Sequence, residues 1–191
     1  MDEVLMARSF LAAQQSPGGW LLQALSLRSA SQRLDWNTFP AIKDEYGFAF
    51  IAEYHLLLGL AFENLLKGYI TLVRLEKKLD PPFPRECYTH RLEELAGRPE
   101  CQSLELTAAE LTVLSRLSPY VEWKGKYPLP KKAIEMSHKT GSTRERDAEN
   151  ALWLRLVPLL KQRAWIMKGG PESMGGYRLY IQRPTTTKTE E

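Results

Sequence analysis

The sequence has little cysteine, and it lacks the segments that mark an exported protein. Cys87 and Cys101 are the only cysteines among 191 residues, and they form no C-x-x-C pair. A domain of this length builds its own core and does not need a disulfide, so we expect two reduced thiols. The N-terminus, MDEVLMARSF, starts with acidic residues instead of the basic and apolar segments of a secretory signal. We therefore expect a cytoplasmic protein.

Long apolar runs are also absent. The longest unbroken run, Leu56–Phe62, includes a glycine and falls well short of the roughly 20 residues that cross a bilayer. We therefore expect no association with a membrane.

Several motifs of known chemistry are missing. The chain has no glycine-rich phosphate loop, no serine in a nucleophile elbow and no H-E-x-x-H zinc motif. Cys87 and His90 have the spacing of metal ligands, but no second close pair of cysteine or histidine accompanies them. The sequence therefore predicts no metal site and no cofactor.

What is present is the composition of an ordinary folded domain. Hydrophobic residues make up 43% of the chain and charged residues 26%, which is far from the composition of disordered proteins. A length of 191 residues fits one domain, which we place at 1–182 with its core at about 20–167. The last residues, 183–191, have little to pack and are expected to form a mobile tail.

The first half of the chain predicts two helices. SPGG at 16–19 is typical of a turn, and the apolar spacing from about 20 to 34 predicts an amphipathic helix. The longest helical pattern runs from about 46 to 79 and is followed by DPPFP, which cannot continue a helix. Because this second helix is apolar on more than one side, we expect it at the centre of a bundle or at a subunit interface.

The second half predicts three more helices. THRLEELAG predicts a short helix with Thr89 as its N-cap, and a capping box of Thr107 and Glu110 starts the next helix. The last helix is expected from about 144 to 167, with Pro158 inside it. No sheet pattern is clear, and the alternating segment 176–184 is interpreted as an arm. The fold class is therefore mainly α: an up-and-down four-helix bundle with an extra N-terminal helix, a long basic connector and a C-terminal arm.

Positive charge is concentrated between Trp123 and Arg146, a segment that contains seven basic residues and two acidic ones. Aromatic rings among lysines are typical of surfaces that stack bases and hold phosphates. In the alternative interpretation, the aromatic residues cap the core and the lysines keep a loop soluble. The candidate residues for binding nucleic acid or phosphate are Trp123, Lys124, Lys126, Tyr127, Lys131, Lys132, His138, Arg144 and Arg146.

Glu63 and Lys67 are four residues apart on the long predicted helix, in the order that favours an ion pair. Their neighbours are strongly apolar, so the pair is expected against the core or a partner. It is interpreted either as a structural ion pair or as part of a ligand-binding groove.

The stretch LAFENLLKGYI, followed about twenty residues later by THRLEEL, resembles the HEPN superfamily of nucleotide-binding helical domains. In many of its prokaryotic members, a long second helix carries a glutamate, a lysine and a glycine, as Glu63, Lys67 and Gly68 do. A loop then leads to a helix that starts with histidine and leucines, as at His90 and Leu92. The resemblance implies a four-helix bundle, often dimeric, that binds RNA or nucleotides and is frequently part of a defence or toxin–antitoxin system.

Catalytic HEPN proteins are metal-independent endoribonucleases that use an arginine and a histidine four to six residues later, generally on the last core helix. Arg85 and His90 match that spacing, but they lie between helices. The last predicted helix carries Arg144 and Arg146 without a histidine downstream. The resemblance therefore favours a HEPN-like binding protein for RNA or a nucleotide, without catalysis of its own.

Two alternatives stay open. One is an endoribonuclease in which Arg85 holds the phosphate and His90 moves the proton. The other is a scaffold whose long apolar helix makes a homodimer or docks a cognate partner protein. A homodimer is expected in either case.

Overall fold

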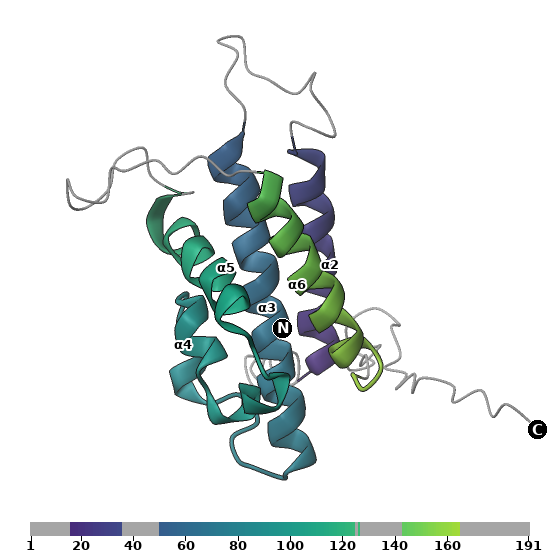
Figure 1. Ribbon diagram of the computed structural model, residues 1–191. Coiled ribbons are helices and arrows are strands. Elements are labelled where there is room, and N and C mark those ends of the chain that lie inside the picture. The colour runs from purple at the N-terminus through teal and green to yellow at the C-terminus, as the bar shows by residue number, and fades with distance from the viewer. Residues whose placement is uncertain (1–15, 36–49, 125, 127–142, 165–191) are drawn as a thin grey trace, which may run out of the picture.

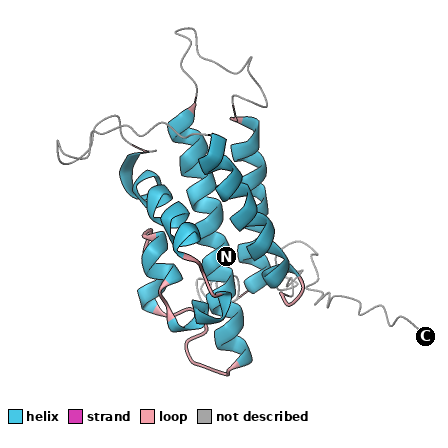
Figure 2. Cartoon of the chain, in the orientation of Figure 1, coloured by secondary structure: helices cyan, strands magenta, loops and turns pink. Residues whose placement is uncertain are grey.

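The chain forms a bundle of helices. The computed structural model describes residues 16–35, 50–124, 126 and 143–164. Four helices, α2 (Pro17–Arg33), α3 (Ile51–Glu76), α5 (Ala108–Pro119) and α6 (Thr143–Lys161), pack side by side and run in alternating directions (Figure 1). Helices and loops account for all of this part of the chain, which contains no strand (Figure 2). The mainly α fold class is confirmed.

Shorter elements connect α3 to α5 and extend α5. A 3-10 turn η1 (Arg85–Cys87), helix α4 (Leu92–Ala96) and a 3-10 segment η2 (Pro99–Leu104) follow α3. A π-helical turn, η3 (Tyr120–Lys124), continues from the end of α5. The predicted arm at 176–184 and nearly all of the basic connector lie outside the described residues.

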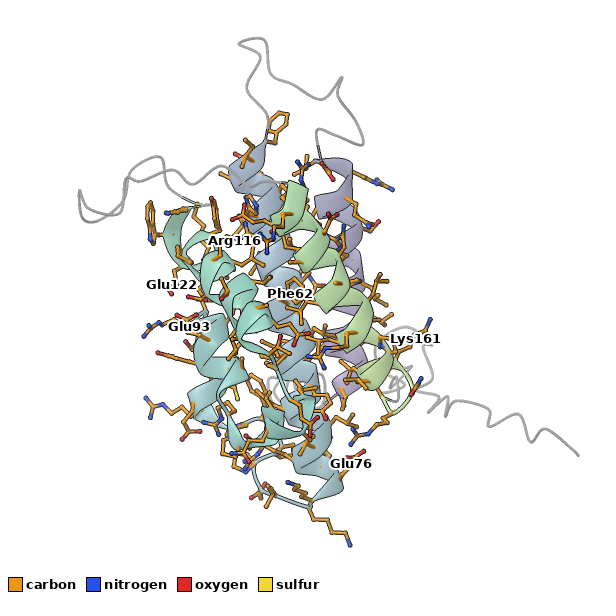
Figure 3. All side chains as sticks on the ribbon, in the orientation of Figure 1. Phe62, Glu76, Glu93, Arg116, Glu122 and Lys161 are labelled. Carbon is orange, nitrogen blue, oxygen red and sulfur yellow. The ribbon has the colours of Figure 1, made fainter. Side chains whose placement is uncertain are left out.

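Helix α3 is the centre of the core. It contacts every other described helix of the bundle, and Phe62 lies in the middle of the molecule with its ring edge-on to Trp153, at 5.6 Å between centroids (Figure 3). By length and hydropathy α3 alone among the described helices is apolar enough to cross a membrane, but most of its apolar surface is buried inside the bundle. The prediction that this helix lies at the centre of a bundle is confirmed.

The predicted turn at 16–19 is wrong, because α2 begins at Pro17. Ser16 is the N-cap, and its side-chain oxygen accepts a hydrogen bond from the Gly19 N–H at 3.1 Å. Proline suits the first helical position because its missing N–H would have no partner there. A serine cap and a proline therefore start the helix where the glycines suggested a turn.

The long helix ends earlier than predicted. It stops at Glu76, since Lys78 has a left-handed backbone with φ of 53° and the Leu79 N–H donates to the Arg74 carbonyl at 2.8 Å. A left-handed residue is a common way to end a helix, and here it acts before the prolines are reached. At the other end, residues 46–49 of the predicted helix lie outside the described part.

The predicted N-cap at Thr89 is also wrong. Thr89 accepts a hydrogen bond from the Arg91 N–H at 3.1 Å, and α4 begins only at Leu92. The Leu92 N–H donates to the side chain of Ser118 on α5, at 2.8 Å. A side chain distant in the sequence thus accepts the hydrogen bond of the first backbone N–H of α4. His90 lies in the loop before this helix.

The capping box of α5 is confirmed. The Glu110 N–H donates to Thr107 Oγ1 at 3.3 Å, and the Thr107 N–H donates to Glu110 Oε2 at 2.8 Å. The last helix was predicted at 144–167. It spans Thr143–Lys161 with Pro158 inside it, and residues 165–167 lie outside the described part.

Candidate functional site

A layer of polar side chains crosses one end of the hydrophobic bundle. We call Arg28 of α2, Tyr54 and His55 of α3, Arg116 of α5, and Glu149 and Asn150 of α6 the polar layer. Figure 3 shows Arg116 at the end of the bundle opposite Glu76 and Lys161. All four long helices contribute to this layer, so it is positioned by the whole bundle.

Glu149 is the centre of the polar layer and is fully buried. Its carboxylate accepts hydrogen bonds from the Arg116 guanidinium and, at 3.0 Å, from the Tyr54 hydroxyl. His55 Nε2 lies 3.7 Å from the same carboxylate and 3.4 Å from Arg116 Nη1. The buried negative charge is therefore paired and hydrogen-bonded, as burial of a carboxylate requires.

Burial shifts the pKa values of both α3 side chains in the layer. The pKa of His55 is lowered to about 4, first by burial and then by the positive charge of Arg116. The pKa of Tyr54 is raised to about 12 by burial and by the negative charge of Glu149. Both side chains are uncharged at neutral pH, so Arg116 and Glu149 form the ion pair of the layer.

A pocket opens beside the layer, against the η3 turn. We call this pocket of about 780 Å³ the η3 pocket, and it lies among α4, α5, η3 and the start of α6. The ring of Tyr120, which lines it, lies 4.7 Å from the ring of His55. Its charged lining residues are Glu93, Arg116, Lys124 and Glu145. The pocket therefore offers an aromatic face with charges of both signs.

Lys124 lies over two aromatic rings at this pocket. Its Nζ is 5.7 Å from the centroid of Tyr120 and 5.4 Å from that of Trp123. Both distances are within the range of a cation–π contact. The η3 turn thus brings together a cation and two rings.

The structure places part of the predicted basic segment around η3. Trp123 is partly buried, whereas Lys126 and Arg144 are exposed. Arg146 has a mostly buried side chain, and its Nη1 pairs with Asp35 at 2.9 Å. The other predicted binding residues, Tyr127, Lys131, Lys132 and His138, lie outside the described residues.

Glu63, Lys67 and His90 form a second polar cluster on α3 and the loop before α4. Lys67 Nζ lies 2.7 Å from Glu63 Oε1, and both side chains are buried. His90 Nδ1 lies 3.0 Å from Glu63 Oε2, and its side chain is 55% exposed. A carboxylate can only accept, so His90 Nδ1 carries the proton of this hydrogen bond. The buried pair therefore fixes the orientation of a surface histidine.

Arg85, the other half of the predicted catalytic pair, lies in η1 and is exposed. Within the described part of the chain, its side chain makes no hydrogen bond or ion pair with His90 or any other residue. The pair thus shares a loop region without a direct contact.

The two cysteines are buried and free. Burial raises the pKa of both thiols, that of Cys101 to about 12, so both are protonated and unreactive. In the described ranges, no group of three or more histidine, cysteine, aspartate or glutamate side chains could hold a metal ion.

Sequence reasoning identified none of the six members of the polar layer as a functional residue. One signal was present: Glu149 precedes Leu152, Leu156 and Leu160 at helical spacing, so a carboxylate stands within the buried stripe of α6. Its partner on α5 is 33 residues away in the sequence and follows from no local pattern.

No protein-family model, curated protein or solved structure matches this chain. Its geometry and chemistry alone bear on its function.

Proposed function

We propose that the protein is a HEPN-like, non-catalytic binding protein for single-stranded RNA or a nucleotide, and that the ligand binds at the η3 turn. The observation that carries this proposal is Lys124, which lines the η3 pocket and lies over the rings of Tyr120 and Trp123. Aromatic faces beside mobile cations are the groups with which proteins hold unpaired bases and their phosphates.

The charges around the pocket suggest an orientation for the ligand. The carboxylates of Glu93 and Glu145 line the pocket and would repel a phosphate, but they accept hydrogen bonds from the amino groups of bases. Lys126 and Arg144 are exposed and carry positive charge close in sequence to the pocket residues Lys124 and Glu145. We therefore place the base in the pocket and the phosphates along Lys124, Lys126 and Arg144.

The test is binding of a fluorescent single-stranded RNA, followed by anisotropy at several salt concentrations. A triple variant, Lys124→Ala with Lys126→Ala and Arg144→Ala, is expected to bind at least about tenfold more weakly. Its log–log salt slope is expected to be smaller by about 2, because fewer counterions are released.

The matched control removes three exposed cations elsewhere, at Lys77, Lys78 and Lys161. It keeps the same net charge as the triple variant and should bind like the wild type. Equal loss in both variants would show only a nonspecific charge effect, and unchanged binding in the first variant would contradict the proposal. A mononucleotide competitor distinguishes a nucleotide ligand from an RNA strand.

A second candidate function, metal-independent RNA cleavage, is favoured by the hydrogen bond between His90 and Glu63. Cleavage of RNA needs a group that takes the proton of the ribose 2′-hydroxyl, and a carboxylate-oriented imidazole is suited to this role. The exposed loop position leaves His90 accessible to a strand.

This function predicts cleavage of an RNA pool in EDTA that is lost in His90→Ala and strongly reduced in Glu63→Gln. Glu94→Gln, a change of an exposed carboxylate in the adjoining helix, is the control and should cleave normally. Intact RNA with the wild-type protein, read on a denaturing gel, would exclude this candidate and leave the binding function.

A further inference from the structure

We propose that Arg28 and the pocket that it lines bind a phosphate group, at a site separate from the η3 pocket. This second pocket has a volume of about 400 Å³ and lies between α2, the start of α3 and α6. We call it the Arg28 pocket, and its polar lining includes Gln32, Arg33, Asp35, Tyr54 and Asn150.

Arg28 is a buried cation that has no anionic partner among the residues that the structure describes. Only 6% of the residue is exposed, yet within the described residues its guanidinium meets only neutral acceptors: Nη2 donates to the amide oxygen of Asn150, and the Tyr54 hydroxyl lies close to it. Nε and Nη1 are buried without a hydrogen-bond partner within the described part of the chain. The face of Trp153 lies 5.9 Å from the guanidinium carbon and offers a weak cation–π contact. A buried guanidinium with free donors is costly unless an anion pairs with it.

The neighbouring side chains do not supply the missing negative charge. Glu149 is already paired with Arg116, and its other oxygen accepts from Tyr54. Tyr54 stays a neutral phenol, because burial and Glu149 raise its pKa to about 12. Asp35 is paired with Arg146. Water would satisfy the free donors of Arg28 but not its charge.

Phosphate fits the charge and the size of this pocket. The exposed Arg33 also lines it, so two arginines border the pocket, and the one lining carboxylate is already paired with Arg146. A dianionic phosphate matches two cations better than a singly charged carboxylate does, and it is recognised well by planar guanidinium groups. The volume admits a free phosphate or the phosphate of a small nucleotide.

The experiment measures thermal unfolding of the full chain in a buffer free of phosphate. Sodium phosphate is titrated against sodium chloride and sodium acetate at equal ionic strength, with adenosine monophosphate as a fourth ligand. Phosphate is expected to raise the unfolding temperature saturably, because a ligand that binds only the folded state stabilises it. A rise with phosphate identifies free phosphate as sufficient, whereas a rise with the nucleotide alone identifies a nucleotide site, which belongs to the Arg28 pocket if Arg28→Met and Asn150→Asp abolish the rise and to the η3 pocket if they keep it.

Two variants assign the effect to Arg28. Arg28→Met is expected to abolish the saturable rise. Asn150→Asp places a carboxylate at the atom that already accepts from Arg28, so it should raise the unfolding temperature by itself and also abolish the phosphate effect. The second variant keeps the test decisive if Arg28→Met does not fold.

Arg163→Met is the control, because Arg163 forms an exposed ion pair with Glu76 and does not line the Arg28 pocket. This variant should keep the full response to phosphate. The proposal is overturned if the wild type responds no more to phosphate or the nucleotide than to chloride, if acetate acts equally, or if both Arg28→Met and Asn150→Asp keep the response. Because none of these variants changes η3, the result is independent of the RNA-binding test.

Discussion

Single residues in the polar layer have properties that the bundle imposes on them. His55 stands in an apolar stretch of the sequence, and it is buried. The carboxylate of Glu145 favours a charged imidazole and so raises the pKa of His55, but burial and the positive charge of Arg116 outweigh that effect and keep the ring neutral. The ionisation of a residue is thus decided by atoms contributed from three helices.

The lowered pKa of His55 makes stability depend on pH. The folded pKa of about 4 lies below the ordinary value of 6.5, so the unfolded chain takes up a proton first as the pH falls. Stability is therefore lost between pH 6.5 and about 4, by about 3 kcal/mol in the unfolding free energy. His55→Gln should lack this part of the pH dependence.

Urea unfolding across that pH range, with wild type and variant measured side by side, isolates the contribution of His55. An identical pH dependence in both proteins would show that the histidine is not held neutral by the fold.

Among the elements, η3 is the one whose position matters most for the proposed ligand site. It rests on α3 through a close approach between Gly59 and Val121, where a Cβ on Gly59 would overlap Val121 Cγ2. Gly59 is buried in the middle of a helix, a place where glycine is otherwise unfavourable. Its small size lets the turn that carries Tyr120 and Lys124 lie against the core.

Gly59→Ala should therefore push η3 away from α3. We expect a loss of about 1–3 kcal/mol in the unfolding free energy, as for other overpacked cores, together with weaker RNA binding. Urea unfolding and RNA anisotropy on the same preparation measure both effects.

Gly97→Ala is the matched control for this change. Gly97 is exposed and has a φ of −76°, which any residue adopts, and a Cβ there would lie 3.3 Å from the Glu93 carbonyl oxygen, so its loss in unfolding free energy should be smaller than that of Gly59→Ala. A Gly59→Ala protein as stable as this control would mean that the contact between α3 and η3 is not tightly packed.

At the scale of the whole molecule, the bundle brings together residues that the sequence keeps apart. The polar layer joins Arg28 to Asn150, 122 residues later, and Tyr54 to Glu149, 95 residues later. The two pockets lie beside this layer. Arg116 lines the η3 pocket, and Arg28 lines the Arg28 pocket. A layer shared by four helices gives both pockets a rigid base, which favours preorganised binding of a charged ligand.

The sequence by itself determined the helical class, the central place of α3 and the capping box of α5. These follow from periodicity, composition and contacts within one turn, which are local properties. It also indicated that a cation, Lys124, and an aromatic ring, Trp123, occur side by side, because the two residues are adjacent in the chain.

Only the tertiary structure decided the start of α4, the partners of Glu149 and the isolation of the buried Arg28. Each depends on side chains from helices far apart in the sequence. Ser118 accepts a hydrogen bond from the Leu92 N–H, Arg116 forms an ion pair with Glu149, and Arg28 donates a hydrogen bond to the neutral Asn150. The physical reason is that burial and charge pairing are set by what packs against a residue in space, whereas helix formation is set mainly by its neighbours along the chain.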